Sequence, residues 1–253
     1  MSWCDKLAST PSVGFRFKAH HQSGDSILHA LAPLLDKWAK PMKQGFTIER
    51  HESFRVQLVT DDGFQYYFDQ ERMFVEFKHR MRVKAQSGGP PIAELMSRPR
   101  PFTELLPEVT GRVIEAAELV NGVKPRALNR IGVVSTTSVS GPEAPPGIRR
   151  LITYLGKPWA NDLEYFDFNV AGVIAKTEEF TDRCIHSLAR PEDTEQLMSI
   201  KFDWQRTFAI TKFATADMLK KMAAAAGKSA LAYFEDIGEG RRFDDEHINS
   251  NPA

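Results

Sequence analysis

A regular alternation of apolar and polar side chains constrains the fold of this chain more than any other feature. In residues 197–208, the apolar side chains of Ile200, Phe202 and Trp204 are separated by single polar residues, and residues 13–20 alternate in the same way. A period of two is typical of a β-strand that buries one face and exposes the other. The sequence therefore predicts antiparallel sheets whose apolar faces pack on helices and whose polar faces meet solvent or a partner.

The pattern along the chain predicts the element order β-α-β-β-β-α twice. Apolar residues that recur every three or four positions indicate helices, and a run rich in Pro and Gly over residues 86–101 indicates a long loop. The Asp62-Gly63 pair marks a hairpin turn between strand-like runs. The predicted strands cover residues 13–20, 46–50, 54–60, 73–83, 130–139, 163–176, 183–188 and 197–208, and the predicted helices cover about residues 25–38, 102–121, 148–155 and 214–234.

This order places the protein in the α+β class, with two similar β-α-β-β-β-α subdomains that have mainly antiparallel sheets. The N-terminal subdomain is predicted over residues 13–122 and the C-terminal one over residues 127–234. Residues 1–12 are expected to form a flexible lead-in. The polar and acidic residues 235–253 are expected to form a disordered tail.

The composition is that of a soluble globular protein without a dominant charge. Lys and Arg number 33 and Asp and Glu also number 33, so no net charge draws the chain to nucleic acid or to an anionic membrane. No apolar run approaches the roughly 20 residues that cross a bilayer, and no secretion signal stands at the N-terminus. Cys4 and Cys184 are too few for a disulfide framework. We therefore expect a cytoplasmic protein that contacts no membrane.

The tripeptide Gly227-Lys228-Ser229 resembles the end of a phosphate-binding loop. Such a loop needs the pattern G-x-x-x-x-G-K-[ST], and its first glycine would fall at Met222. The four alanines before Gly227 favour a helix. We therefore expect Gly227 to break or cap that helix, with Lys228 near its C-terminal end.

Asp69, Glu76 and Lys78 form the motif that most resembles a catalytic set. Metal-dependent nucleases place an Asp and a Glu-x-Lys on adjacent strands, where the carboxylates hold Mg²⁺ and the lysine supports the attacking water. A spacing of two puts Glu76 and Lys78 on the same face of a strand. A solvated sheet face is the simpler interpretation, because 26% of the chain is charged and short charged triplets arise by chance. The nuclease therefore stands as an alternative.

A basic stripe is the clearest sign of a binding surface. Residues 72–100 carry seven basic side chains against two acidic ones. Four of the basic residues alternate with apolar ones and are expected on one face of the strand over residues 73–83. Such a face suits an acidic partner protein or nucleic acid. The predicted partner-binding residues are Lys78, Arg80, Arg82 and Lys84.

The seven histidines show no spacing typical of metal ligands, so neither a metal nor a cofactor is predicted. Cys184 and His186 stand two residues apart on a predicted strand, which is the spacing that a Cys/His dyad would need. The simpler interpretation is a thiol in the core beside an exposed imidazole.

Two segments carry a family resemblance. One is Asn-Arg-Ile-Gly-Val-Val at residues 129–134, after a long helix, and the other is residues 197–204, followed by a helix near Ala214. Together they resemble a sporadically distributed family of uncharacterised bacterial proteins of similar length. That family has a central strand of the type Arg-Ile-Gly-Leu-Arg-Tyr, then a late strand with alternating aspartates, then a helix. The chain departs from it where Val-Val-Ser stands at residues 133–135 and where Asp203 stands alone.

The resemblance implies a partner-binding role, because the patchy distribution of the family is like that of antiphage defence or toxin–antitoxin genes. It assigns no catalytic residue. We therefore predict a non-enzymatic subunit or adaptor of a bacterial multiprotein complex. Its partner is expected to be another protein of the same complex or operon, and homo-oligomers are left open. A metal-dependent nuclease and a nucleic-acid-binding protein are the alternatives.

Overall fold

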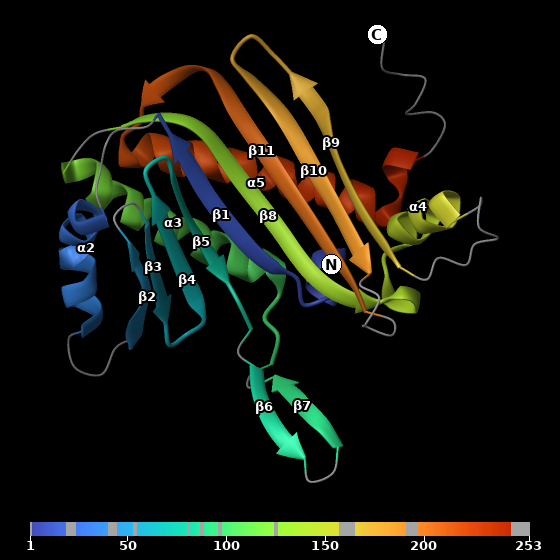
Figure 1. The fold of residues 1–253 in the computed structure, drawn as a ribbon. Coiled ribbons are helices and arrows are strands. Elements are labelled where there is room, and N and C mark those ends of the chain that lie inside the picture. Colours follow the sequence, from blue (N-terminus) through green and yellow to red (C-terminus); the bar gives the residue numbers. More distant parts are fainter. Residues whose placement is uncertain are drawn as a thin grey trace.

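Nine strands form one antiparallel sheet in the computed structural model, in the order β2-β3-β4-β5-β1-β8-β11-β10-β9 (Figure 1). The structure describes residues 2–18, 24–39, 45–52, 55–79, 81–86, 89–95, 98–123, 126–156, 165–190 and 197–243. The strands of the sheet are β1 (Thr10–Phe17), β2 (Phe46–Glu52), β3 (Arg55–Thr60), β4 (Phe64–Asp69), β5 (Arg72–Phe77), β8 (Ala127–Ser140), β9 (Phe166–Lys176), β10 (Phe180–Arg190) and β11 (Leu197–Phe213). The α+β class is therefore confirmed.

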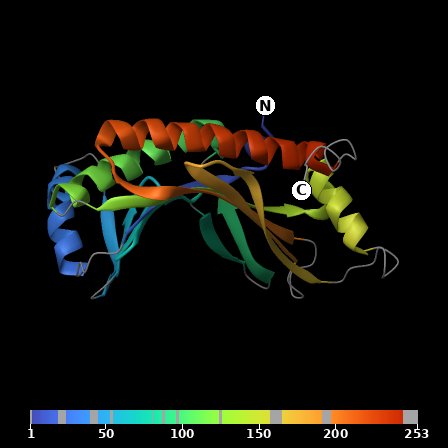
Figure 2. The same cartoon turned by 90° about the horizontal axis from the view of Figure 1, so that it is seen from above.

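Helices cover one face of this sheet and leave the other open (Figure 2). Two long helices, α3 and α5, lie across the covered face, with α2 and α4 at its two sides. The flanks of the sheet curve away from the helices, so the open face is concave. The helices are α1 (Trp3–Lys6), α2 (Gly24–Ala39), α3 (Phe102–Val123), α4 (Pro146–Gly156) and α5 (Ala216–Glu239), with short 3₁₀ turns at Gly141–Glu143 and Arg241–Phe243. Within the described ranges, none of these helices has the length and apolar content to span a membrane.

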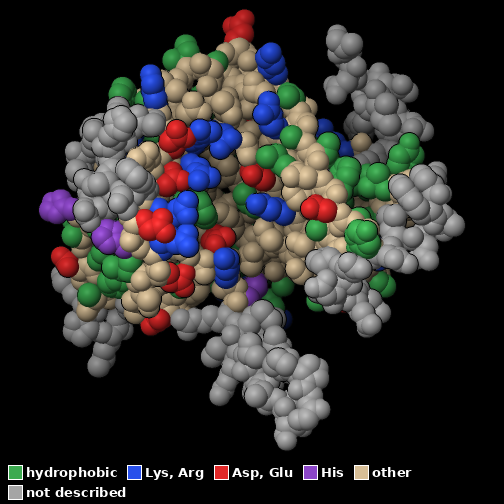
Figure 3. Space-filling model, viewed as in Figure 1, with side chains coloured by type: hydrophobic (Ala, Val, Ile, Leu, Met, Phe, Trp, Pro, Cys, Tyr) green, Lys and Arg blue, Asp and Glu red, His purple; other side chains and the backbone are tan. Residues whose placement is uncertain are grey.

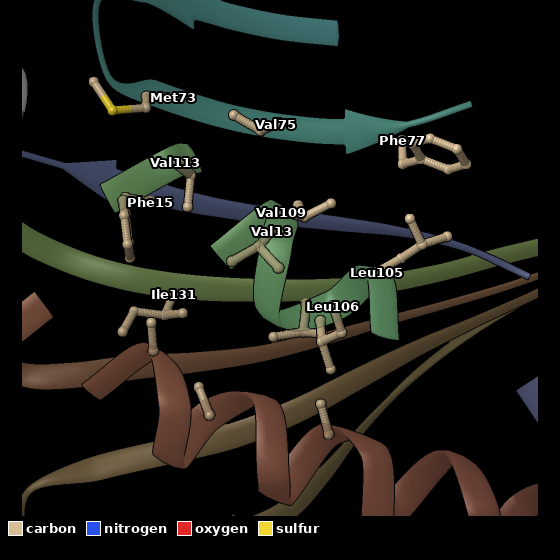
Figure 4. Close-up of a cluster of buried hydrophobic side chains, with 14 of the residues drawn as sticks. Val13, Phe15, Met73, Val75, Phe77, Leu105, Leu106, Val109, Val113 and Ile131 are labelled. Atoms are coloured by element: carbon tan, nitrogen blue, oxygen red, sulfur yellow. The ribbon is translucent and has the colours of Figure 1, made fainter. Parts of the chain in front are cut away.

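The core lies between the sheet and helix α3 (Figure 4). Leu105, Val109 and Val113 on one side of α3 meet Val13 and Phe15 of β1, and each of the five is at most 2% exposed. Their spacing of four residues on the helix and of two on the strand is what places them on facing surfaces. Burying such a side chain contributes about 1.5–3 kcal/mol. The alternation predicted for β1 and β11 is confirmed by their burial.

The two halves of the chain meet at the centre of the sheet, where β1 pairs with β8 from Thr10 opposite Thr136 to Arg16 opposite Arg130. The second half follows the predicted order β8-α4-β9-β10-β11-α5. The first half contributes one strand more to this sheet than predicted, because β4 follows the predicted turn at Asp62-Gly63 and was not expected. The arrangement in two subdomains is not confirmed, since both halves contribute to a single sheet.

A separate hairpin interrupts the first half between β5 and α3. Its strands are β6 (Met81–Gln86) and β7 (Gly89–Leu95), and it projects away from the main sheet (Figure 1). The single strand predicted over residues 73–83 and the loop predicted over residues 86–101 are therefore wrong. Strand β5 ends at Phe77, and the N–H of Lys78 donates to the carbonyl of Gly63 at 3.0 Å beside the β3–β4 turn. Only the backbone of the hairpin is described.

Both chain ends differ from the prediction. Trp3 of α1 is 4% exposed and donates its Nε1–H to the carbonyl of Phe234 in α5 at 2.5 Å. Gly238 leaves room for the indole, because a Cβ there would lie 2.1 Å from Cδ1 of Trp3. Ser2, Trp3 and Cys4 are therefore buried, and this segment is not a loose lead-in. Helix α5 also continues to Glu239 and ends at Gly240 with a φ of 83°, so the predicted tail begins too early. Its residues 244–253 lie outside the described residues.

Candidate functional site

Three arginines lie side by side in the middle of the open face. Arg72 on β5 is opposite Arg16 on β1, and Arg16 is opposite Arg130 on β8. Neighbouring strands are about 4.7–4.9 Å apart, so the three side chains form a row, called here the arginine row. Figure 3 shows Lys and Arg side chains gathered over this part of the face, with Asp and Glu side chains among them. Like charges in directly opposite positions destabilise a sheet unless carboxylates lie nearby.

Carboxylates compensate two of the three arginines. The Nε–H of Arg16 donates to Oε2 of Glu71 at 2.9 Å, and the Nε–H of Arg72 donates to Oδ2 of Asp69 at 2.8 Å. Arg130 has no carboxylate within ion-pair distance among the described residues. Of the three arginines, Arg130 is therefore the one without a direct ion pair among the described residues, although the negative charge of Asp203 acts on it from nearby.

Arg130 is instead the first member of a hydrogen-bonded chain. Its Nη1–H donates to Oε1 of Gln205 at 2.7 Å, and the Nε2–H of Gln205 donates to Oδ2 of Asp203 at 3.0 Å. Burial lowers the pKa of Arg130, and the positive charge of nearby Arg16 lowers it further. Burial also raises the pKa of Asp203, against the opposing effects of the Gln205 hydrogen bond and of the positive charges on Lys201 and Arg130. A cation and an anion are thus held apart by one amide.

A pocket of about 360 Å³ opens above these groups. Its floor lies at Gly14 of β1 and Gly132 of β8, which are directly opposite each other on the open face. Phe74 of β5 and Gln205 of β11 stand at the same level on the two sides. Because the two central strands carry no side chain at this level, the sheet backbone is accessible between them. A volume in the range of 300–1,000 Å³ is usual for ligand pockets.

An aromatic pair lies on the β4–β5 side of the pocket. Tyr67 and Phe74 are stacked with their ring centroids 4.7 Å apart and their planes at 20°. The guanidinium carbons of Arg55 and Arg72 lie 5.5 Å and 5.9 Å from the centroid of Tyr67, within the range of cation–π contacts. The open face therefore combines cations with flat apolar surface.

The structure keeps Glu76 and Lys78 of the nuclease motif together and places Asp69 at the other end of β4. The Nζ of Lys78 lies 2.8 Å from Oε1 of Glu76 and donates to Oε1 of Gln65 at 2.9 Å. Asp69 is four residues from Gln65 along β4, which corresponds to about 13 Å. Its Oδ1 accepts two backbone N–H groups of the β4–β5 turn, so it stabilises that turn. In the part of the chain that is described, no group of three or more His, Cys, Asp or Glu side chains is placed to hold a metal ion.

The structure also divides the predicted basic stripe. Lys78 follows β5 at the end of the main sheet, whereas Arg82 and Lys84 belong to β6 in the projecting hairpin. Arg80, between them, lies outside the described residues. The stripe is not a single strand face, because the chain leaves the main sheet after Lys78.

Gly227 and Lys228 lie inside α5 and not at its end. The helix runs unbroken from Ala216 to Glu239, so the expected break at Gly227 is wrong. Gly227 faces Leu106 of α3, where even an added Cβ would be 3.8 Å away. The glycine is one of the small buried residues that let α5 lie close to α3, and Lys228 is exposed to solvent. The backbone groups that a phosphate loop would use are engaged in the helix.

Cys184 and His186 lie on the covered face of β10. Cys184 is 1% exposed, which confirms a core thiol, and burial raises its pKa so that the thiol stays protonated. The expectation of an exposed imidazole at His186 is wrong. Its Nε2 lies 3.0 Å from the hydroxyl of Tyr233, and its ring lies 4.9 Å from that of Phe202. Burial lowers the pKa of His186 to about 4, so the imidazole is neutral at physiological pH.

Neither the arginine row nor the glycine floor is evident from local sequence patterns. Arg16, Arg130 and Gly132 stand at polar positions of correctly predicted strands, so their exposure on one face was within reach. Their proximity depends on the antiparallel register of β1 with β5 and β8, which no local pattern determines. The two segments that carry the family resemblance are neighbours here, with Trp204 opposite Val133 and Asp203 opposite Val134.

A comparison with protein-family models and with curated proteins finds no match for this chain. The resemblance to the sporadically distributed bacterial family therefore stays a prediction.

Proposed function

We propose that this protein is a non-enzymatic partner-binding subunit of a bacterial multiprotein complex and that it binds a partner protein with the open face of its sheet. The observation that carries the proposal is the arginine row, in which Arg130 on the central strand β8 has no carboxylate within ion-pair distance among the described residues. A half-buried guanidinium without a direct ion pair is costly in the free protein. A carboxylate of a partner would relieve that cost.

The shape of the molecule supports the same proposal. Helices cover one face of the sheet, so the concave face is the one that offers the central strands to a partner (Figure 2). Its pairs, such as Arg16 with Glu71, are each worth only about 0–1 kcal/mol at an exposed site and can rearrange on contact. A cytoplasmic setting and a role in antiphage defence or in a toxin–antitoxin module rest on the sequence resemblance and on composition.

The test begins with purification of the tagged chain from a bacterial host and identification of the chain that accompanies it. The two purified chains are then titrated against each other at low and high salt. We expect Arg130→Glu to weaken binding of that chain by at least about tenfold, because reversing a charge in an interface adds repulsion to the lost contact. We also expect binding by the unaltered chain to weaken with salt.

Lys220→Glu is the matched control, because it reverses one exposed charge on the helix-covered side of the molecule. Both variants must unfold at the same temperature as the original chain, which shows that their fold is kept. Loss of binding in the Lys220 variant, with full binding in the Arg130 variant, would place the interface on the helices and refute the proposal. Light scattering of the free chain tests the homo-oligomer in the same preparation.

Nucleic acid is the second candidate, favoured by the stacked pair of Tyr67 and Phe74 beside Arg55 and Arg72. Aromatic side chains on an open sheet face with nearby cations are typical of single-strand binding surfaces. The carboxylates of Asp69 and Glu71 argue against it, since they would face the phosphates. Titration with labelled single-stranded DNA and RNA at low salt decides between the two. Tight binding that is lost on Phe74→Ala would favour nucleic acid over a protein partner.

A further inference from the structure

The pocket above the glycine floor is shaped by what two strands lack. Gly14 and Gly132 place no side chain on the open face, while Phe74 and Gln205 rise on either side. A glycine within a strand costs stability relative to residues that prefer strands, and it often marks a place where another group approaches the backbone. Gly132 is not required by crowding, because an added Cβ would meet nothing closer than 3.8 Å.

The polar groups of the pocket have unused hydrogen-bonding capacity. The guanidinium of Arg130 has five N–H donors and, among the described residues, uses one of them, on Gln205. Within the same part of the chain, the carboxylate of Asp203 accepts one side-chain hydrogen bond, also from Gln205, although it can accept several. Gln205 thus keeps the two charges from pairing directly. A bound group could accept hydrogen bonds from Arg130 while it donates one to Asp203.

The local charge selects the kind of anion. The arginine row has a charge of +1 after Glu71 and Asp69 are counted, and Lys201, Glu76 and Asp203, which also line the pocket, bring the charge of the whole group to zero. A site without net positive charge favours an anion with one charge over an anion with two. A phosphate dianion would bring a second negative charge next to Asp203 and Glu76, both of which line the same pocket. A carboxylate carries a single charge and matches the planar fork of a guanidinium with two parallel hydrogen bonds.

We propose that this pocket binds one carboxylate group of the partner, with the carboxylate on Arg130 and a neighbouring amide N–H on Asp203. The proposal rests on the proposed function and specifies the chemistry of its interface. An aspartate or glutamate side chain and a C-terminal carboxylate share this chemistry, since each stands beside a backbone N–H. Phosphate and neutral amides are expected to bind more weakly.

Small probes test the pocket without the partner. The backbone amide signals of Gly14 and Gly132 are followed by NMR during titration with N-acetylalanine, which has a free α-carboxylate beside an amide N–H. The α-methylamide of N-acetylaspartate supplies a side-chain carboxylate, N-acetylalanine amide is the neutral control, and inorganic phosphate is the dianion. We expect saturable shifts with one or both carboxylate probes. The probe that binds more tightly identifies whether the partner supplies a C-terminal or a side-chain carboxylate. The neutral control is expected to give none.

Two variants of the full chain make the test specific. Arg130→Gln is expected to weaken binding of the carboxylate probe by about tenfold or more, because a hydrogen bond to a charged group is lost. Gly132→Val is expected to abolish it by filling the floor, while thermal unfolding shows that the fold is kept. Lys220→Gln removes a positive charge on the helix side and is expected to leave probe binding unchanged.

The proposal is overturned if neither carboxylate shifts the glycine signals, if phosphate binds more tightly than both, or if both pocket variants bind the probes like the original chain. These failures are distinguishable from failure of the proposed function. Loss of partner binding in Arg130→Glu without probe binding would keep the open face as the interface and refute the carboxylate pocket. If the probes bind but Arg130→Glu leaves partner binding unchanged, the pocket does bind carboxylates and the open face is refuted as the interface with the partner.

Discussion

The two faces of the central strands β1 and β8 differ in what their residues do for the fold. On the covered face, Val13, Phe15 and Val133 are at most 2% exposed and belong to the hydrophobic core. On the open face, the same strands carry two glycines and two of the three members of the arginine row. Glycines weaken a strand, and neighbouring like charges repel, so the open face is not arranged for maximal stability. Such local conflicts with stability are expected where a surface has a function.

The contrast between the two faces predicts that substitutions at neighbouring residues of one strand have very different effects on stability. Phe202 of β11 is fully buried and contacts the rings of Trp3, His186 and Phe234. We expect Phe202→Ala to lower the free energy of unfolding by about 3–5 kcal/mol, through lost burial and a cavity. Chemical denaturation measures it.

Lys201, the preceding residue, points to the open face and is exposed. Lys201→Ala is the matched control and should change stability by no more than about 0.5 kcal/mol. Similar losses in both variants would contradict the contrast between the two faces.

The second prediction concerns acid sensitivity on the covered face. Burial lowers the pKa of His186 from 6.5 to about 4, so the unfolded chain takes up a proton at a pH where the folded chain does not. Stability is therefore lost as the pH falls from about 6.5 towards 4. The loss is about 1–3 kcal/mol, since one pKa unit corresponds to about 1.4 kcal/mol.

His186→Gln removes the titrating group while a polar side chain remains for Tyr233. The variant should therefore lose less stability than the original chain between pH 7 and pH 4.5, as measured by urea unfolding at each pH. Equal losses in the two proteins would show that His186 is as easily protonated in the folded state as in the unfolded one.

The third prediction separates the two glycines of the pocket floor. A Cβ on Gly14 would lie 2.7 Å from Cβ of Phe74 and 3.0 Å from the carbonyl oxygen of Met73, so the strands must shift to accept it. We expect Gly14→Ala to cost about 1–3 kcal/mol, as overpacking does. Gly132→Ala meets only ordinary contacts and should be neutral or stabilise by up to about 1 kcal/mol. Thermal melts of the two variants, side by side, test the difference, and a loss in Gly132→Ala equal to that in Gly14→Ala would disprove it.

Local patterns explain which parts of the fold could be predicted. The strands β1, β8 and β11 and the helix α3 have strong periodicity, and all four lie close to the predicted ranges. The hairpin β6–β7 was missed because Pro and Gly dominate its second strand. The docking of α1 was missed because it depends on contacts between residues far apart in the sequence, such as those of Trp3 with Phe202 and Phe234.

The candidate site could be predicted only in part, because it is assembled by strand register. The basic residues around Lys78 were recognised as a cluster in sequence, but the chain turns out of the sheet after that residue. Arg16, Arg72 and Arg130 are far apart in the chain and meet because three strands pair side by side. A charge cluster of this kind has no signature in a window of ten or twenty residues.

The smallest expected effect belongs to Asp203 on the open face, and it has the opposite pH dependence to that of His186. Burial raises the pKa of Asp203 above its ordinary value of 3.8. A carboxyl group whose pKa is raised by folding favours the folded state when protonated, so stability is lost as the pH rises through the folded-state pKa.

Asp203→Asn keeps an acceptor for Gln205 without the charge. The variant should therefore be more stable than the original chain at neutral pH, and the difference should vanish in acid, where both side chains are neutral. Urea unfolding at pH 7 and pH 3.5 measures it. A variant that is less stable at pH 7 would mean that attraction to Arg130 and Lys201 outweighs the cost of burial. The Asp203 carboxylate would then be a group that stabilises the open face.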